Sequence, residues 1–338
     1  MHTICLLPRK LGLGGPASFQ ARLAEALHAQ GIKTIFDPDD LAVSAILVVG
    51  GTKQLADLRR ARRRGVRIVQ RLNGMNWVHK RKFTGVKHFF RAEVNNWILS
   101  TIRENLTDRI VYQSHFTQGW WQRVHGQVEA ASTIIYNGVD LNEFSPVGVN
   151  SRPMNRYRML LVEGHLGGGY EQGLITAVKA AELLNQRLDR PLELMVVGDV
   201  PLTLRKQVST DKVNILWQGV VRRNEIPEID RSAHFLFSSD INAACPNSVV
   251  EALASGLPVV GYDTGALPEM VVNDAGRIAA YGGDVWKLDK PNLYSLVDAA
   301  QEVLTNLGEF SAGARRQAEA VFDIQKIAAS YRKVLLDD

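Results

Sequence analysis

Short apolar runs alternate along the chain with longer segments in which apolar residues recur every three or four positions. Apolar runs of four to eight residues predict buried strands, and the 3.6-residue period predicts helices. The runs predict strands at 3–7, 33–36, 45–49, 66–70, 109–112, 158–163, 192–197, 213–217, 235–238 and 259–260. The periodic segments predict helices at 17–30, 174–184 and about 324–336. Such alternation favours an α/β fold with parallel sheets.

The length of 338 residues is that of two ordinary domains. Residues 145–156 contain two prolines, two asparagines and Gly148, a composition typical of a linker. We therefore expect one domain at 1–147 and a second at 157–323, each with its own strand and helix series.

The net charge of +5 is unevenly distributed. Residues 59–91 contain twelve Lys or Arg and no Asp or Glu, and the rest of the chain has 28 bases against 35 acids. The aromatic residues Trp77, Phe83, Phe89 and Phe90 accompany these bases. Bases and aromatics together can dock on an anionic bilayer surface or recognise a phosphorylated acceptor, whereas a solvated helix face at 59–64 explains part of the charge. Nucleic-acid binding is not expected, because no nucleic-acid-binding motif accompanies the charge.

The lengths of the apolar runs bear on where in the cell the protein is located. None approaches the ~20 residues of a membrane span, and the apolar start before Pro8 is too short for a signal peptide. We expect a cytoplasmic protein, with peripheral contact at the inner membrane face if the 59–91 segment binds lipid. The two cysteines, Cys5 and Cys245, provide neither a disulfide framework nor metal-ligand spacing.

Residues 245–271 form the most informative motif, a helix followed by a short buried strand and a second helix start. Asn247 or Ser248 can cap the first helix, Glu251 falls in its first turn, and Gly256 ends it. Exposed first-turn amides and the helix dipole attract anions. The alternative is that Ser248 and Glu251 form only a capping box.

This motif resembles the signature of GT-B nucleotide-sugar glycosyltransferases, in particular the retaining glycosyltransferase family 4. Residues 134–140, followed by Phe144, are similar to the end of that family's first domain. The resemblance implies two Rossmann-like domains facing a cleft, with the acceptor on the first domain and the nucleotide sugar on the second. It also implies that the C-terminal helix, 324–338, packs back on the first domain.

The resemblance assigns roles to particular residues. The amides of Asn247, Ser248 and Val249 would hold the donor diphosphate, and Glu251 would bind the ribose. Gly14 and Gly15 would approach the donor phosphates, and a turn at 217–219, with Gln218 and Gly219, would contact the base. The implied donor is a UDP-sugar in preference to a GDP-sugar, with no cofactor or metal, and the implied acceptor is a hydroxyl group. The basic segment 59–91 adds the option that this acceptor is lipid-linked or anionic.

The chain departs from the family pattern at two places. Ala243 occupies the position of an earlier glutamate that touches the donor sugar, and Asp240 or Asn242 are candidate replacements. His165 and Glu171-Gln172 stand where the family has an arginine and a lysine that neutralise the diphosphate. The glycines at 167–169 could bind the anion instead, or charge could come from Arg9, Lys10, Arg222 or Arg223.

Arg71 and Asn73, at the end of a predicted strand, are acceptor-side candidates, because ligands collect at the carboxyl ends of such strands. Three alternatives remain. Gly12 to Ala17 fits the loose fingerprint G-x-G-x-x-A, with Asp37 about 20 residues on, which favours an NAD-dependent oxidoreductase. Asp37-Pro-Asp39-Asp40 spells a D-x-D metal pattern, although a turn is the simpler interpretation. Ala243 and His165 are also compatible with a non-catalytic nucleotide-sugar-binding relative.

Overall fold

The computed structural model describes residues 2–9, 14–167 and 171–337. Lys10, Gly12, Gly168 and Gly169, named above, lie outside this range. The chain divides into two compact units: unit 1 comprises Met1–Gly138 with Asp323–Asp338, and unit 2 comprises Val139–Phe322. The segment expected to be a linker, 145–156, lies within unit 2.

The core of unit 1 is a six-stranded parallel sheet in the order β2-β1-β3-β4-β5-β6. The strands are β1 (Thr3–Leu7), β2 (Lys33–Ile35), β3 (Val43–Val49), β4 (Arg67–Leu72), β5 (Arg109–Tyr112) and β6 (Ala131–Ile134). Its central strands are near-continuous apolar runs because helices cover both faces.

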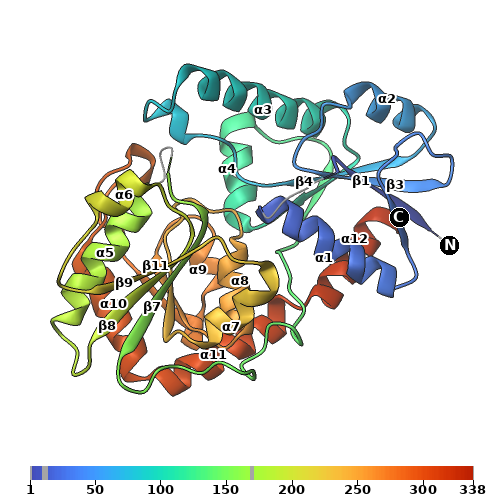
Figure 1. The fold of residues 1–338 in the computed structure, drawn as a ribbon. Helices are drawn as coiled ribbons and strands as arrows, with labels where there is room; N and C mark the ends of the chain where they lie inside the picture. Colours follow the sequence, from blue (N-terminus) through green and yellow to red (C-terminus); the bar gives the residue numbers. More distant parts are fainter. Residues whose placement is uncertain (1, 10–13, 168–170, 338) are drawn as a thin grey trace. The chain divides into compact units, whose positions relative to one another are not determined.

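Helices of unit 1 cover the two faces of this sheet (Figure 1). They are α1 (Gly15–Ala29), α2 (Leu55–Arg63), α3 (Val86–Asn105), α4 (His115–His125) and α12 (Ile324–Leu336), with a short 3-10 turn η1 (Val78–Lys80). One core cluster joins α1 and α12 to the sheet, and Phe19 of α1 contacts Tyr331 of α12 with ring centroids 5.5 Å apart. The expectation that the C-terminal helix returns to the first domain is confirmed.

Unit 2 contains a second six-stranded parallel sheet, in the order β12-β11-β10-β7-β8-β9. The strands are β7 (Tyr157–His165), β8 (Leu192–Asp199), β9 (Asn214–Gly219), β10 (Phe235–Ser238), β11 (Val259–Tyr262) and β12 (Gly276–Ala279). The helices are α5 (Glu171–Asn185), α6 (Leu202–Gln207), α7 (Ile226–Arg231), α8 (Asn247–Ala254), α9 (Leu267–Met270), α10 (Leu293–Thr305) and α11 (Leu307–Val321). Short 3-10 turns are η2 (Arg223–Glu225), η3 (Asn273–Ala275) and η4 (Val285–Lys287).

The two sheets differ in strand order. Counted from its own first strand, unit 2 has the order 3-2-1-4-5-6 of dinucleotide-binding folds, and the order reverses between β7 and β10. Unit 1 has the order 2-1-3-4-5-6, which reverses between β1 and β3. Two doubly wound, Rossmann-like units confirm the predicted fold class.

Among the helices that the structure describes, none is long and apolar enough to cross a bilayer.

Candidate functional site

The carboxyl edge of the unit 2 sheet brings most of the predicted site residues together. Parallel strands end at one edge, and open α/β sheets bind ligands there, at the point where the strand order reverses. In unit 2 that point lies between β7 and β10. Three of the predicted residues end strands, namely His165, Gln218 and Gly219, and Asp240 and Asn242 lie in the loop after β10. Helix α8 follows that loop and begins with Asn247, Ser248 and Val249.

Helix α8 begins directly after the loop that follows β10. Its N-cap is Pro246, in an extended conformation, so Asn247 and Ser248 occupy the first two helical positions and neither is the N-cap. This corrects the expected capping, including the capping box. The first intrahelical bond runs from the Val250 amide to the Pro246 carbonyl at 3.4 Å. The Ser248 and Val249 amides precede it, as the anion-binding interpretation requires.

Glu251 lies in the second turn of α8, one turn later than expected, and is only 8% exposed. The neighbouring carboxyl group of Asp230, on α7, is 1% exposed and lies near the Ser255 hydroxyl, which donates to it at 3.5 Å. Burial and, next, the charge of Glu251 raise the pKa of Asp230 well above its usual range.

A second acid pair, which the sequence analysis missed in part, lies at the switch point. Glu163 belongs to β7 and Asp240 follows β10, and these two strands are hydrogen-bonded neighbours. The Ser239 hydroxyl donates to Oε1 of Glu163 at 2.9 Å. Burial, followed by the charge of Asp240, raises the pKa of Glu163, and burial raises that of Asp240. The one signal for Glu163 in the sequence is a charged residue closing an apolar strand.

The loop between β10 and α8 has a constrained backbone. Asn242 is buried and adopts a left-handed conformation with φ of 57°, and its side-chain Nδ2 has no hydrogen-bond acceptor in the part of the chain described. The carbonyl of Ala243 accepts a 2.9 Å hydrogen bond from the Ala266 amide. A Cβ atom on Gly265, whose φ is +62°, would lie 2.6 Å from the Ala243 nitrogen. Only glycine fits this close approach, so Gly265 fixes the position of the loop.

His165 and the β9 end occupy the other side of the switch point. Nδ1 of His165 is 2.8 Å from Oδ2 of Asp199, at the end of β8, and both side chains are exposed. Gln218 and Gly219 are the last residues of β9 rather than a turn beyond it, which corrects the predicted strand end. The register shifts there, since Val196 pairs with Trp217 and Val197 pairs with Gly219, so Gln218 is the extra residue of a bulge.

In unit 1, Arg71 is held inside the fold. It is 2% exposed, donates to Oδ1 of Asn73 at 3.1 Å and to Oδ1 of Asn137, and its guanidinium carbon lies 3.6 Å from the Phe19 ring centroid. Asn73 is half-buried, and its carbonyl accepts a 2.7 Å bond from Nε1 of Trp121. Arg71 therefore links β4 to α1 and to Asn137 inside unit 1. Asn73 is the more accessible of the two acceptor candidates.

Gly14 and Gly15 follow β1, one of the two strands between which the strand order of unit 1 reverses. Gly14 is the N-cap of α1 with φ of −70°, and a Cβ atom there would meet no described atom within 4 Å. Neither backbone conformation nor internal packing therefore requires glycine at this position. Gly15 is the first helical residue and is exposed.

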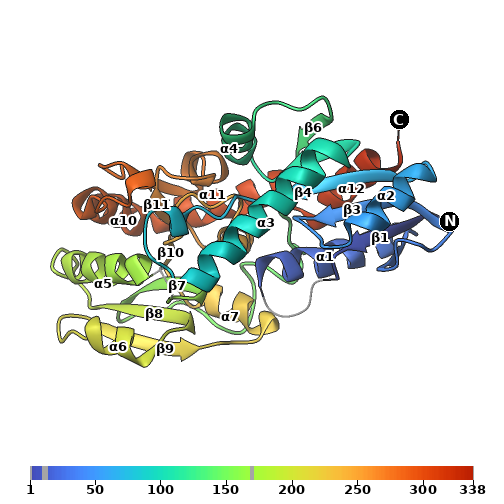
Figure 2. The ribbon, with the colours of Figure 1, turned by 90° about the horizontal axis from the view of Figure 1, so that it is seen from above.

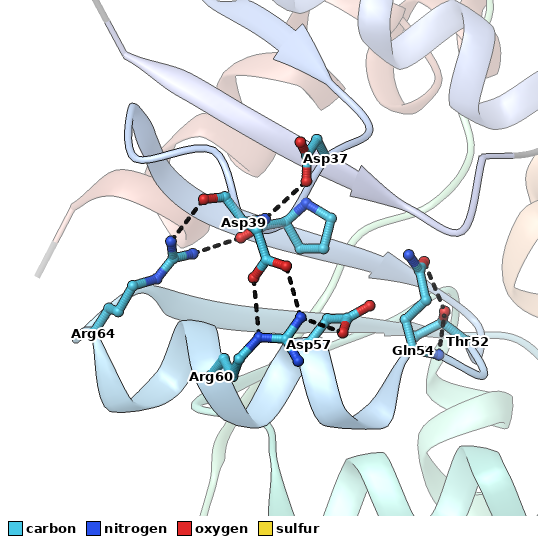
Figure 3. Close-up of polar contacts among 8 residues, drawn as sticks. Asp37, Asp39, Thr52, Gln54, Asp57, Arg60 and Arg64 are labelled. Carbon is cyan, nitrogen blue, oxygen red and sulfur yellow. Dashed lines mark hydrogen bonds and ion pairs between the residues drawn. The ribbon is translucent and has the colours of Figure 1, made fainter.

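The D-x-D segment forms a turn bound by Arg60 of α2 and by Arg64, the C-cap of α2 (Figure 3). Oδ1 of Asp37 accepts the Asp39 amide at 3.0 Å, and the Asp39 carboxylate binds Arg60 at 2.6 Å. Arg60 holds the pKa of Asp39 below its usual range, chiefly through that hydrogen bond. Arg64 caps the carbonyls of Pro38 and Asp39. Among the side chains described, no group of three or more His, Cys, Asp or Glu could hold a metal ion.

Comparison with known proteins agrees with this geometry. Residues 158–306, which span the unit 2 sheet, match the protein-family model described as Glycosyl transferases group 1. No curated protein matches the sequence.

Solved structures show the same fold at low identity. Sucrose-phosphate synthase from Thermosynechococcus elongatus has a TM-score of 0.74 and 16% identity, covering 100% of both chains. WaaG, a glycosyltransferase involved in lipopolysaccharide biosynthesis, has a TM-score of 0.73 and 15% identity, covering 99% of this chain and 100% of its own. Anabaena HepE, solved with UDP and glucose, has a TM-score of 0.68 and 15% identity, with 99% of each chain covered. The fold is thus the GT-B arrangement of two Rossmann-like domains.

Proposed function

We propose that the protein transfers a sugar from a nucleoside diphosphate sugar to a hydroxyl acceptor. The observation that carries the proposal is the start of α8 at the carboxyl edge of the unit 2 sheet. The amides of Ser248 and Val249 precede the first intrahelical bond there, and the buried Glu251 follows one turn later. The match of residues 158–306 to Glycosyl transferases group 1 supports the same conclusion.

The residues at this edge suit the parts of such a donor. The helix start favours the diphosphate through its amides and dipole. The Glu251 carboxylate would accept hydrogen bonds from the ribose hydroxyls. Glu163 and Asp240 present carboxyl oxygens that suit hydroxyl groups of the transferred sugar, and they offset the absence of a carboxylate at Ala243.

His165 is our candidate for stabilising the leaving diphosphate. Its Nδ1 lies 2.8 Å from Oδ2 of Asp199, which orients the exposed ring at the end of β7. A hydrogen-bond donor near the diphosphate stabilises the charge that develops when the sugar leaves. Gly14 and Gly15 remain predicted phosphate contacts.

We further propose retention of the anomeric configuration, a UDP-sugar donor, and an acceptor that is lipid-linked or anionic. A retaining transfer needs no protein nucleophile if the acceptor attacks from the face that the leaving group departs, and the protein then contributes positioning and electrostatics. The UDP preference draws on Anabaena HepE, which was solved with UDP-glucose. Peripheral contact with a membrane belongs to the same proposal, since a lipid-linked acceptor lies at a bilayer surface.

The test is turnover with a panel of UDP-, GDP- and ADP-sugars and hydroxyl acceptors, with the product followed by NMR. Acceptor-dependent release of nucleoside diphosphate and a product with the donor's anomeric configuration are expected. Donor binding without transfer to any acceptor would favour a non-catalytic relative, and NAD-dependent hydride transfer would replace the proposal altogether.

A further inference from the structure

The first three turns of α3 present apolar side chains to solvent. Val86, Phe90, Val94 and Trp97 are 61%, 64%, 50% and 61% exposed. At ~100° per residue these four positions fall within an arc of about 80° on one side of the helix. We call them the α3 stripe; α3 is the long teal helix of Figure 2.

This stripe is not the face that holds α3 in the fold. The opposite side carries Ala92 and Ile102, which are 2% and 0% exposed, and Ile102 belongs to a core cluster with residues of β3 and β4. Helix α3 is therefore apolar on two sides, and the core uses one of them. A helix in water needs a single apolar face.

Two more phenylalanines extend the exposed apolar surface: Phe83 lies just before α3, and Phe89 lies within it. Phe83 is 83% exposed, and Phe89, 41% exposed, packs edge-on against Phe90 with centroids 5.9 Å apart. Single exposed apolar residues are ordinary, whereas several large ones gathered over three turns mark an interaction site.

Basic side chains flank the same surface. Lys80, Arg81, Lys82, Lys87 and Arg91 are all exposed. Lys80 pairs with Glu93 at 3.1 Å, and within the described chain Arg81, Lys87 and Arg91 form no ion pair. By contrast, Arg60 of α2 and Arg64, the C-cap of α2, are bound by the turn at 37–40 (Figure 3). Among the described residues, Arg81, Lys87 and Arg91 therefore leave unpaired positive charge beside the α3 stripe.

We propose that the α3 stripe docks on an anionic lipid surface. Its aromatic and aliphatic side chains enter the boundary between headgroups and acyl chains, and the flanking bases lie over the lipid phosphates. A second copy of this chain fits less well, because the stripe and its basic flank would meet another positive surface. The inference rests on the proposed function in one respect: the surface would be the one that presents the hydroxyl acceptor.

The experiment measures binding of the full-length protein to large unilamellar vesicles by flotation at about 0.1 M salt. Vesicles of phosphatidylcholine with 30% phosphatidylglycerol are compared with phosphatidylcholine alone, and about tenfold or stronger binding to the anionic vesicles is expected. Phe90→Glu with Trp97→Glu should reduce that binding at least about tenfold. Lys87→Glu with Arg91→Glu should reduce it by about 25-fold or more, at roughly fivefold per basic charge.

Matched controls come from unit 2. Leu202 is 73% exposed and Lys206 is an exposed base on the same helix, so Leu202→Glu and Lys206→Glu should leave vesicle binding unchanged. Thermal melting of each variant, with and without UDP, shows that the fold and the donor site are intact.

Equal binding to neutral vesicles, or no binding to either kind, would overturn the inference. So would a dimer in sedimentation that Phe90→Glu dissolves, because the stripe would then be an interface between copies. Vesicle binding needs neither donor nor turnover. If vesicle binding is absent while UDP binding is present, the docking surface is wrong and the proposed function stands. If vesicle binding is present while UDP binding is absent, the proposed function is wrong and the docking surface stands.

Discussion

Ser239 donates a hydrogen bond of 2.9 Å to Glu163 and thereby ties the end of β10 to the end of β7 at the switch point of unit 2. Asp240, the next residue, adds a negative charge that raises the pKa of Glu163 beyond the effect of burial. The carboxyl groups of Glu163 and Asp240 therefore lie together at the carboxyl edge of the sheet, and the ionisation of one affects the pKa of the other.

Replacement of Glu163 by Gln should change how stability depends on pH. The folded-state pKa of Glu163 is raised from 4.5 to about 8 and that of Asp240 from 3.8 to about 6. A carboxyl group with a raised pKa contributes stability below its unfolded pKa and loses it as pH rises through the folded value. Between about pH 4 and pH 8, the wild type should lose stability relative to Glu163→Gln, as measured by urea unfolding.

The matched control is Glu25→Gln on the exposed face of α1, which should not alter the pH profile. Parallel profiles for the wild type and Glu163→Gln would show that Glu163 ionises normally and that the acid pair does not exist as described.

Replacement of Glu251 by Ala should weaken UDP binding by about 1–3 kcal/mol, because the ribose hydroxyls would lose a charged acceptor. Isothermal titration with UDP measures the change, and Glu182→Ala on α5 serves as a surface control. Unchanged affinity for every nucleoside diphosphate tested would remove Glu251 from the site.

Gly265→Ala should destabilise unit 2 by about 2–4 kcal/mol, since the new Cβ would meet rigid backbone of Ala243 and the φ of +62° disfavours alanine. Gly119→Ala is the control, because Gly119 lies within α4 and a Cβ there meets nothing within 4 Å. Alanine should stabilise α4 by about 0.5–1 kcal/mol. Equal melting temperatures for the two variants would contradict this account of the loop.

Arg71→Ala should cost about 2–4 kcal/mol of stability, because it leaves Asn73 and Asn137 without their buried donor and empties the space against Phe19. Arg71→Lys should also destabilise, since an ammonium group cannot reproduce the planar fork. Urea unfolding gives both values. Full stability together with lost acceptor binding would return Arg71 to the acceptor site.

Elements whose ends are marked by local residues could be predicted from the sequence. β5, β10 and α12 occur at the predicted residues, since apolar runs or periods end there at polar neighbours. α3 was missed because it is apolar on two sides, which obscures the 3.6-residue period. A helix was expected at α8 with Asn247 or Ser248 as its cap, but Pro246 is the N-cap and the helix begins one or two residues earlier than expected.

Features that depend on distant partners could not be predicted. Glu163 and Asp240 are 77 positions apart in the sequence and become neighbours only through the order of the strands in the sheet. The sequence shows the bases at 59–64, but it does not show that Arg60 and Arg64 bind Asp39, because those contacts form only in the tertiary fold. Similarly, a strand end does not reveal that Arg71 is directed into the interior.

The most direct test of the central claim, that the start of α8 holds a nucleoside diphosphate, is a thermal-shift panel of UDP, GDP, ADP and NAD(H). A ligand present at one hundred times its dissociation constant adds about 2.7 kcal/mol of stability. We predict that a nucleoside diphosphate, with UDP favoured, raises the melting temperature and that Glu251→Ala reduces the shift at the same concentration. Stabilisation by NAD(H) alone, or by none of these ligands at millimolar concentration, would contradict the claim.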